Sequence, residues 1–198
     1  LNGERIMKKS LDRSFYIPDG STEIKDPESD AVAYLYNIEE KLVAMGFCGK
    51  GKKPVWHYYF SSKENRDKYV DKLFSDRQYS LARKEVEKKE RALKVEENVK
   101  NTKVGDIYYS SWGYDQTNID FYKIVAKKGS KSFMLQEIGQ TVDSNGSSQD
   151  LVMPYEKTYK GKPVMKRMGA YGFNLNSYSI ATKWDGKPKH QTAIGYGH

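Results

Sequence analysis

The chain has 198 residues and carries 34 Lys and Arg against 26 Asp and Glu, a formal net charge of +8 at pH 7. This length suits one domain of ordinary size or two small ones and excludes a large multidomain enzyme. Aromatic residues make up 13% of the chain, which excludes simple disorder because disordered chains are poor in core-forming residues. No run approaches the roughly 18 apolar residues of a membrane span. The single cysteine, Cys48, cannot form an internal disulfide, so we expect a soluble protein of a reducing compartment.

The positive charge is unevenly distributed along the chain. Residues 1–76 carry 13 charges of each sign, residues 77–103 carry 9 positive and 5 negative, and residues 104–198 carry 12 and 8. The excess therefore belongs to the middle and to the C-terminal half. A basic balance favours nucleic acid or another acidic partner, because it speeds encounter and releases counterions. The alternative is that the charge serves solubility alone.

Residues 1–30 mix charges with proline and glycine and predict a loosely ordered arm. Three runs rich in β-branched and aromatic residues follow, AVAYLYNI, KLVAMGFC and PVWHYYF, and they predict three strands. The break GKGKKP between the last two suits a hairpin tip, since glycine tolerates positive φ. This tip carries Lys50, Lys52 and Lys53, which we expect either to contact a nucleic-acid backbone or to be solvated.

The pattern becomes helical after Phe60. Apolar residues from Tyr69 to Phe74 fall at helical spacing, and Ser61 with Glu64 matches a capping box. These features predict a helix packed on the strands, and so a small α+β domain over residues 31–76. Residues 77–103 contain strong helix formers with few apolar positions and predict a charged connecting helix, either a solvated spacer or a basic helix lying on phosphates.

Residues 104–198 predict a β-rich domain. The candidate strands are VGDIYYS, IDFYKIVAKK, KSFMLQEIG, DLVM, PVMKRM and NSYSIATKW, with glycines between them. Short strands at this spacing suggest a small β-barrel or β-sandwich. The predicted fold class is therefore α+β: an N-terminal antiparallel β-sheet with a packed helix, a charged connecting helix, and a C-terminal small barrel or sandwich-like domain.

Motifs for catalysis are weak in this sequence. The segment GFCGKGKK has the spacing of a phosphate-binding loop, but Lys53 and Pro54 stand where Ser or Thr should open a helix. The three histidines lie far apart, so neither a zinc site nor a cofactor is expected. One enzymatic hypothesis stays open, a Mg²⁺-dependent nuclease, with pairing to lysines or turn capping as the alternative role of its carboxylates. These carboxylates are Asp106, Asp115, Asp120 and Glu137.

The segment SSWGYDQTNIDFY, residues 110–122, combines aromatic rings with amides. Aromatic faces stack on bases or on partner side chains, and amides offer both a donor and an acceptor. The alternative is that Trp112 and Tyr114 fold back to close the mouth of a barrel. The residues expected to recognise a ligand are Trp112, Tyr114, Asp115, Gln116 and Asn118.

Lysines in the C-terminal half supply candidate phosphate contacts. The late segment KWDGKPKH interleaves basic residues with an aromatic one and either lies along a phosphate backbone or is solvated. The candidates are Lys123, Lys127, Lys128, Lys131, Lys183, Trp184, Lys187 and Lys189.

Three segments carry a resemblance to known proteins. VGDIYYSSWGYDQTNIDFYKIV, WHYYFSSKENRDKYVDKLF and WDGKPK resemble a group of small proteins encoded by bacteriophages, prophages and plasmids, over roughly residues 54–190. The resemblance implies a genetic setting, an accessory protein of a mobile element in a bacterial cytoplasm. Such proteins often bind nucleic acid or block host machinery, including defence nucleases.

The net positive charge, the aromatic segment 110–122 and the implied genetic setting together favour a non-enzymatic protein that binds DNA, RNA or a nucleoprotein complex. The alternative is an anti-defence inhibitor, similar to an anti-CRISPR protein, that docks on a host effector and uses the same aromatic residues as interface anchors. No membrane partner is expected.

Overall fold

The computed structural model describes residues 11–144 and 146–196. The chain divides into two compact units between Glu87 and Lys88, inside its long helix. We call them the N-terminal unit and the C-terminal unit and describe each by itself. Both contain antiparallel sheets, so the predicted α+β class is confirmed.

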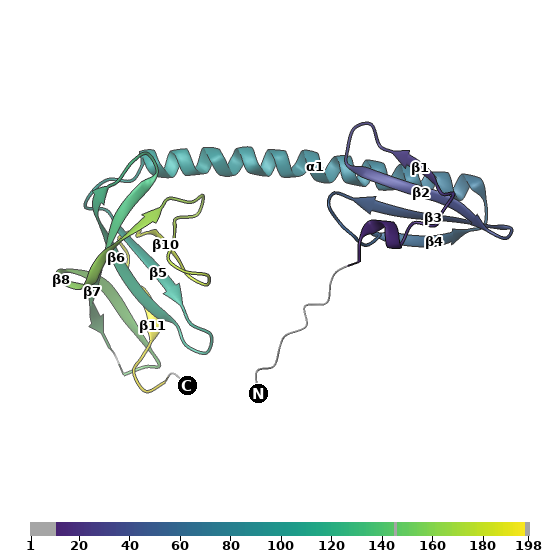
Figure 1. The fold of residues 1–198 in the computed structure, drawn as a ribbon. Helices are drawn as coiled ribbons and strands as arrows, with labels where there is room; N and C mark the ends of the chain where they lie inside the picture. The colour runs from purple at the N-terminus through teal and green to yellow at the C-terminus, as the bar shows by residue number, and fades with distance from the viewer. Residues whose placement is uncertain (1–10, 145, 197–198) are drawn as a thin grey trace, which may run out of the picture. The chain divides into compact units, whose positions relative to one another are not determined.

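The N-terminal unit is built on a four-stranded antiparallel sheet in the order β1-β2-β3-β4 (Figure 1). Its strands β2 (Ala31–Ile38) and β3 (Lys41–Cys48) have the predicted bounds, and β4 spans Trp56–Phe60. The prediction of a loosely ordered arm is wrong for part of its length, because a short 3-10 helix, η1 (Arg13–Phe15), and a further strand, β1 (Thr22–Lys25), lie within it. Strand β1 is ordered by its pairing with β2, which begins six residues after β1 ends. Residues 1–10 of that arm lie outside the described residues.

One helix, α1 (Lys63–Lys100), replaces the two predicted helical stretches. Neither glycine nor proline occurs between its ends, so nothing interrupts the backbone hydrogen bonding where the apolar pattern thins. Its N-cap is Ser62 and not the predicted Ser61, since the Ser62 Oγ accepts a hydrogen bond from the Asn65 backbone N–H at 3.2 Å. The helix therefore begins one residue later than the capping-box pattern suggests.

Small residues let α1 approach the sheet closely. Val70 and Leu73 of the helix pack on the buried alanines of β2 and β3. A Cβ added to Gly46 would lie 2.7 Å from both Leu73 Cδ2 and Trp56 Cε2. Only glycine fits at this point of the N-terminal core.

The C-terminal unit is a seven-stranded antiparallel sheet in the order β11-β8-β7-β6-β5-β10-β9 (Figure 1). Two predicted strands, DLVM and PVMKRM, are parts of the single long strand β8, whose pairing with β7 is irregular at two points. At one of them the buried Gln136 amide donates to the Lys160 carbonyl at 2.8 Å. The strands are β5 (Ile107–Trp112), β6 (Asn118–Lys127), β7 (Ser132–Asp143), β8 (Gln149–Arg167), β9 (Phe173–Asn174), β10 (Ile180–Lys183) and β11 (Lys189–Thr192).

Both faces of this sheet are packed. One core gathers around Phe133, Leu135 and Phe173, and the other around Phe121 and Ile138. Just after β8, Met168 forms an isolated bridge with Phe173 of β9, so the sheet curls toward itself. The strands within residues 11–144 and 146–196 do not form a closed barrel.

In the part of the chain that the structure describes, no helix has a stretch both long and apolar enough to cross a membrane.

Candidate nucleic-acid interface

The aromatic segment forms the β5–β6 hairpin. Trp112 ends β5 opposite Asn118, and its indole Nε1 donates to Asp120 Oδ2 at 2.6 Å. Gly113 has a φ of 126°, and a Cβ there would lie 1.8 Å from the Gln116 carbonyl oxygen. The loop therefore closes only with glycine. Trp112 folds back onto the sheet, as the structural alternative required, but Tyr114 does not, since it is 99% exposed.

A cavity of about 130 Å³ lies beside Trp112 on the concave side of the curled sheet. Burial raises the pKa of Tyr122 in its wall, and the Asp120 and Glu137 carboxylates raise it further. Ser110 lies opposite Asp120 in the register, and its buried Oγ has no hydrogen-bond partner. Sequence reasoning missed this cavity, although strand alternation places Tyr122 on the same face as Asp120. Its lining residues are Trp112, Asp120, Tyr122, Asn176, Tyr178 and Ser179.

The β5–β6 loop belongs to one end of the C-terminal unit, which we call the aromatic end: Trp112 with the connections 113–117, 144–148, 175–179 and 193–196. Antiparallel pairing brings these connections to the same end of the sheet, and the Thr192 N–H donates to the Thr117 carbonyl at 2.9 Å. Their described residues include no Lys or Arg and a single carboxylate, Asp115. Ile194 is 98% exposed and Tyr196 is 56% exposed. This end has exposed aromatic and aliphatic side chains among small polar residues and is not basic.

The opposite end of the unit gathers cations, and we call it the basic end: Lys127, Lys128, Lys131 and Arg167. Three of them flank or form the β6–β7 turn, while Arg167 pairs with Ser132 across β7 and β8. The Met168 N–H donates to the Lys131 carbonyl at 2.8 Å, which joins the two segments. Neither residues 121–136 nor residues 157–184 contain an Asp or Glu. Arg167 was not among the predicted contacts, although the run PVMKRM carries two cations beside the strand end.

Strand length separates these two ends. Strand β6 runs from the aromatic loop to the basic turn over ten residues, which at about 3.3 Å per residue is roughly 30 Å. The predicted stacking residues and three of the predicted phosphate contacts therefore do not form one compact site. A ligand that touches both ends has to span the whole strand.

Three other predicted phosphate contacts are paired with carboxylates. Lys123 pairs with Glu156, Lys183 with Asp106 at 2.8 Å, and Lys189 with Asp185 at 2.7 Å. Burial raises the pKa of the Asp106 carboxyl, but the hydrogen bonds from Lys183 and from the Lys103 backbone N–H, with the charges of both lysines, together lower it below its ordinary value. These ion pairs stabilise the fold, and the neighbouring carboxylates reduce the electrostatic attraction of the three lysines for an anionic ligand.

The late aromatic segment is packed rather than extended as a solvated tail. Trp184 meets Phe121 edge-on at 6.3 Å between ring centroids, and its Nε1 donates to the Lys187 carbonyl at 2.8 Å. Lys189 lies over the Tyr109 ring at 4.6 Å. Lys187, in the same segment, has an exposed side chain.

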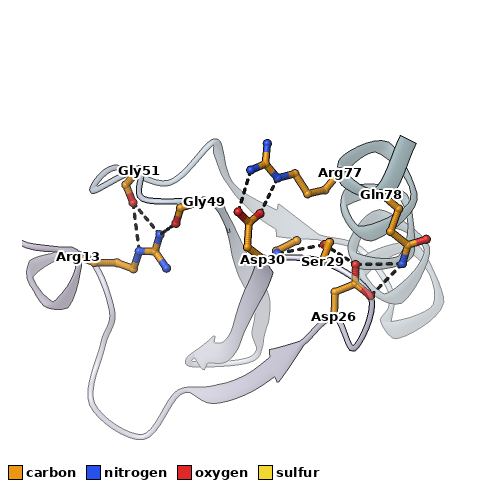
Figure 2. Close-up of polar contacts among 9 residues, drawn as sticks. Arg13, Asp26, Ser29, Asp30, Gly49, Gly51, Arg77 and Gln78 are labelled. Carbon is orange, nitrogen blue, oxygen red and sulfur yellow. Dashed lines mark hydrogen bonds and ion pairs between the residues drawn. The ribbon is translucent and has the colours of Figure 1, made fainter. Parts of the chain in front are cut away.

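The lysine-rich tip belongs to the other unit, on the β3–β4 connection. Lys50, Lys52 and Lys53 are exposed. Figure 2 shows the Arg13 guanidinium donating to the carbonyls of Gly49 and Gly51, at 2.7 and 2.8 Å. The backbone of the tip is thereby fixed, which reduces the entropy lost when its lysines bind a phosphate.

A second ion pair supports the same region. Arg77 of α1 forms a bidentate contact with Asp30, whose two oxygens accept at 2.6 and 2.9 Å (Figure 2). The hydrogen bond from Arg77 lowers the pKa of the Asp30 carboxyl. Next to it, Gln78 donates to Asp26 (Figure 2). These contacts tie α1 to the start of β2.

Three of the four carboxylates considered for a magnesium site have other partners. Asp106 pairs with Lys183, Asp120 accepts from Trp112, and Glu137 lies 3.6 Å from Lys160, while Asp115 is exposed. Within the described ranges, no three or more His, Cys, Asp or Glu side chains group so as to hold a metal ion.

Comparison of the chain with protein-family models, with curated proteins and with solved structures finds no match.

Proposed function

We propose that the C-terminal unit binds nucleic acid and that its basic end contacts the phosphates. The observation that carries this proposal is the grouping of four cations on one turn and the adjacent strand end, in segments without any carboxylate. None of the four has a carboxylate partner among the described residues. Neutralising phosphates with such cations releases counterions, which supplies most of the affinity of non-specific nucleic-acid binding.

We extend the proposal to the cellular setting of the protein and to the architecture of the C-terminal sheet. We take the protein as a non-enzymatic accessory protein of a mobile genetic element that acts in a bacterial cytoplasm. Its curled sheet, with Met168 bridging Phe173, serves as a small open barrel that presents the basic turn. The lysines of the N-terminal tip provide a second phosphate contact in their own unit.

Salt-dependent binding tests the proposal. Fluorescence anisotropy would follow single- and double-stranded DNA and RNA at about 50 and 200 mM salt. The test variant replaces all four residues of the basic end with Gln. A matched control removes the same charge from exposed positions of α1: Lys68, Lys84, Lys89 and Arg91.

The expected size of the effect follows from counterion release. Four phosphate contacts contribute about 3.6 to the slope of log affinity against log salt, which is roughly a 150-fold affinity change over this fourfold salt range. We expect the basic-end variant to lose a large part of that slope and the helix variant to keep it. Loss of the slope in the helix variant alone would move the interface to the helix, and either equal loss in both variants or salt-independent binding would refute the proposal.

The aromatic end favours a second candidate function, docking on a protein. Its described residues lack Lys and Arg, while Tyr114 and Ile194 are almost fully exposed. Aromatic side chains dominate interface energetics, and a surface without cations has little attraction for phosphates. This end suits an anti-defence inhibitor that binds a host effector.

Capture from a nuclease-treated bacterial lysate tests this second function. A protein partner survives removal of nucleic acid, and we expect Trp112→Ala with Tyr114→Ala to lose it while the basic-end variant retains it. If nuclease treatment removed the partner, only the nucleic-acid proposal would remain.

A further inference from the structure

The N-terminal unit contains a buried cation with little compensation. Arg66, in the first turns of α1, is only 7% exposed. Its Nε and Nη2 both lie 3.3 Å from one oxygen of the adjacent Asp67, whose side chain is 54% exposed. No other described residue bonds to this guanidinium. A guanidinium has five N–H donors, so three have no acceptor among the residues that the structure describes. Burying a charge without full pairing is costly.

Arg66 lines a cavity of about 600 Å³ in the N-terminal unit. This volume falls in the range of roughly 300–1,000 Å³ that is usual for small-molecule sites. Apolar surface comes from the end of β2, where Leu35 faces α1 and the following residues Tyr36 and Ile38 alternate with it at the edge of the sheet. The Tyr36 hydroxyl is hydrogen-bonded to His57 Nε2, which fixes the ring.

The remaining wall of the cavity is polar. Asn37 of β2 and Thr22 of β1 offer neutral hydrogen-bonding groups, and the connection Pro18–Gly20 contributes Asp19. Asp19 is the one charged lining residue besides Arg66. The buried guanidinium and the exposed carboxylate therefore suit a ligand with an anionic group and a polar hydrogen donor near the mouth.

We propose that this cavity binds a small anionic molecule, a phosphate or carboxylate group attached to a compact apolar or planar body. The unused donors of Arg66 would hold the anion in the bidentate geometry that a guanidinium provides. The apolar part would lie against Leu35 and the edge of β2. This site is in the N-terminal unit and does not depend on the basic end of the C-terminal unit.

Nuclear magnetic resonance titration tests the site on the full chain. The probes are inorganic phosphate, benzoate and a nucleoside 5′-monophosphate, with the uncharged nucleoside as a control, each up to about 10 mM. We expect saturable shifts of the Arg66 Nε–H and of the amides of residues 19–22 and 35–38 with at least one anion. Tighter binding of the nucleotide or benzoate than of phosphate would show that the apolar part of the ligand contributes to binding.

Variants separate a specific site from general attraction to charge. We expect Arg66→Met to weaken binding at least about tenfold, as loss of charge-assisted hydrogen bonds does, and Lys68→Met on the same helix to leave it unchanged. Asp67→Asn covers the case in which Arg66→Met does not fold. Removing that competing carboxylate should strengthen anion binding.

Three results would overturn this inference. The first is the absence of saturable shifts with any of the anions. The second is an equal loss of affinity in Arg66→Met and Lys68→Met. The third is weaker anion binding in Asp67→Asn.

Discussion

Gly113 allows a direct measurement of how tightly the aromatic hairpin is constrained. A Cβ at this position would lie 1.8 Å from the Gln116 carbonyl oxygen, whereas ordinary contacts begin at 3.4 Å, so the loop would have to open by about 1.6 Å. The φ of 126° adds strain of about 1–3 kcal/mol for any other residue. Overpacking typically costs a further ~1–3 kcal/mol. Since a loop at the edge of the fold relaxes in part, we expect Gly113→Ala to destabilise the C-terminal unit by ~2–4 kcal/mol.

Gly129 provides the matched control, because it separates backbone strain from the clash. It lies in the β6–β7 turn with a φ of 81°, and a Cβ there would meet nothing within 4 Å. Gly129→Ala should therefore cost only the left-handed backbone penalty, about 1–2 kcal/mol. The difference between the two variants measures the contact with Gln116.

Urea unfolding followed by tryptophan emission is the assay. The protein has three tryptophans, and Trp56→Phe leaves Trp112 and Trp184, both in the C-terminal unit. Emission then reports on that unit alone, and a lower midpoint at constant m-value gives the loss of stability. If Gly113→Ala were no more destabilising than Gly129→Ala, the close approach in the hairpin would not exist in solution.

Three further outcomes follow from individual contacts. Folding raises the pKa of Tyr122, so its contribution to stability is complete below the unfolded tyrosine pKa near 10 and is lost as the pH rises. Tyr122→Phe should therefore flatten the loss of stability between about pH 9 and 11. Urea midpoints of this variant that match the wild type at both pH values would contradict the argument. Gln136→Met leaves the Lys160 carbonyl without its side-chain donor and should lower the free energy of unfolding by ~1–3 kcal/mol, whereas an unchanged urea midpoint would show that water replaces the amide. Gly46→Ala forces a methyl group against Trp56 at 2.7 Å and should destabilise the N-terminal unit by ~1–3 kcal/mol. Urea unfolding monitored by Trp56 emission measures this loss. An unchanged urea midpoint would mean that the helix moves away at little cost.

Elements whose pattern is local were predictable from the sequence. Strands β2 and β3 come from runs rich in β-branched and aromatic residues and have the predicted bounds, and the glycine-rich break between β3 and β4 is a hairpin connection. Strands β1, β9 and β11 escaped prediction because they contain two to four residues and form only by pairing with a neighbour. The thinning of apolar residues in α1 suggested two helices, although no residue there breaks a helix.

The candidate site was predictable residue by residue but not as an arrangement. The composition of residues 110–122 left recognition and packing equally open for its aromatic residues, and in the structure Tyr114 is almost fully exposed while Trp112 is hydrogen-bonded to Asp120. The pairing of Lys123, Lys183 and Lys189 with carboxylates depends on which strands are neighbours and on how the chain turns between them. Such contacts have no signature in a single sequence.

The sequence by itself determined the α+β class, the location of the aromatic hairpin and the basic character of the C-terminal half, because these follow from periodicity and composition. Only the tertiary structure decided that the aromatic residues and the phosphate-binding candidates lie at opposite ends of β6, since an extended strand of ten residues keeps its ends roughly 30 Å apart. It also decided that Arg66, one of many charged residues on α1, is buried in a cavity wall. The physical reason is the same in both cases: strand register and helix rotation place each side chain relative to residues far away in the sequence.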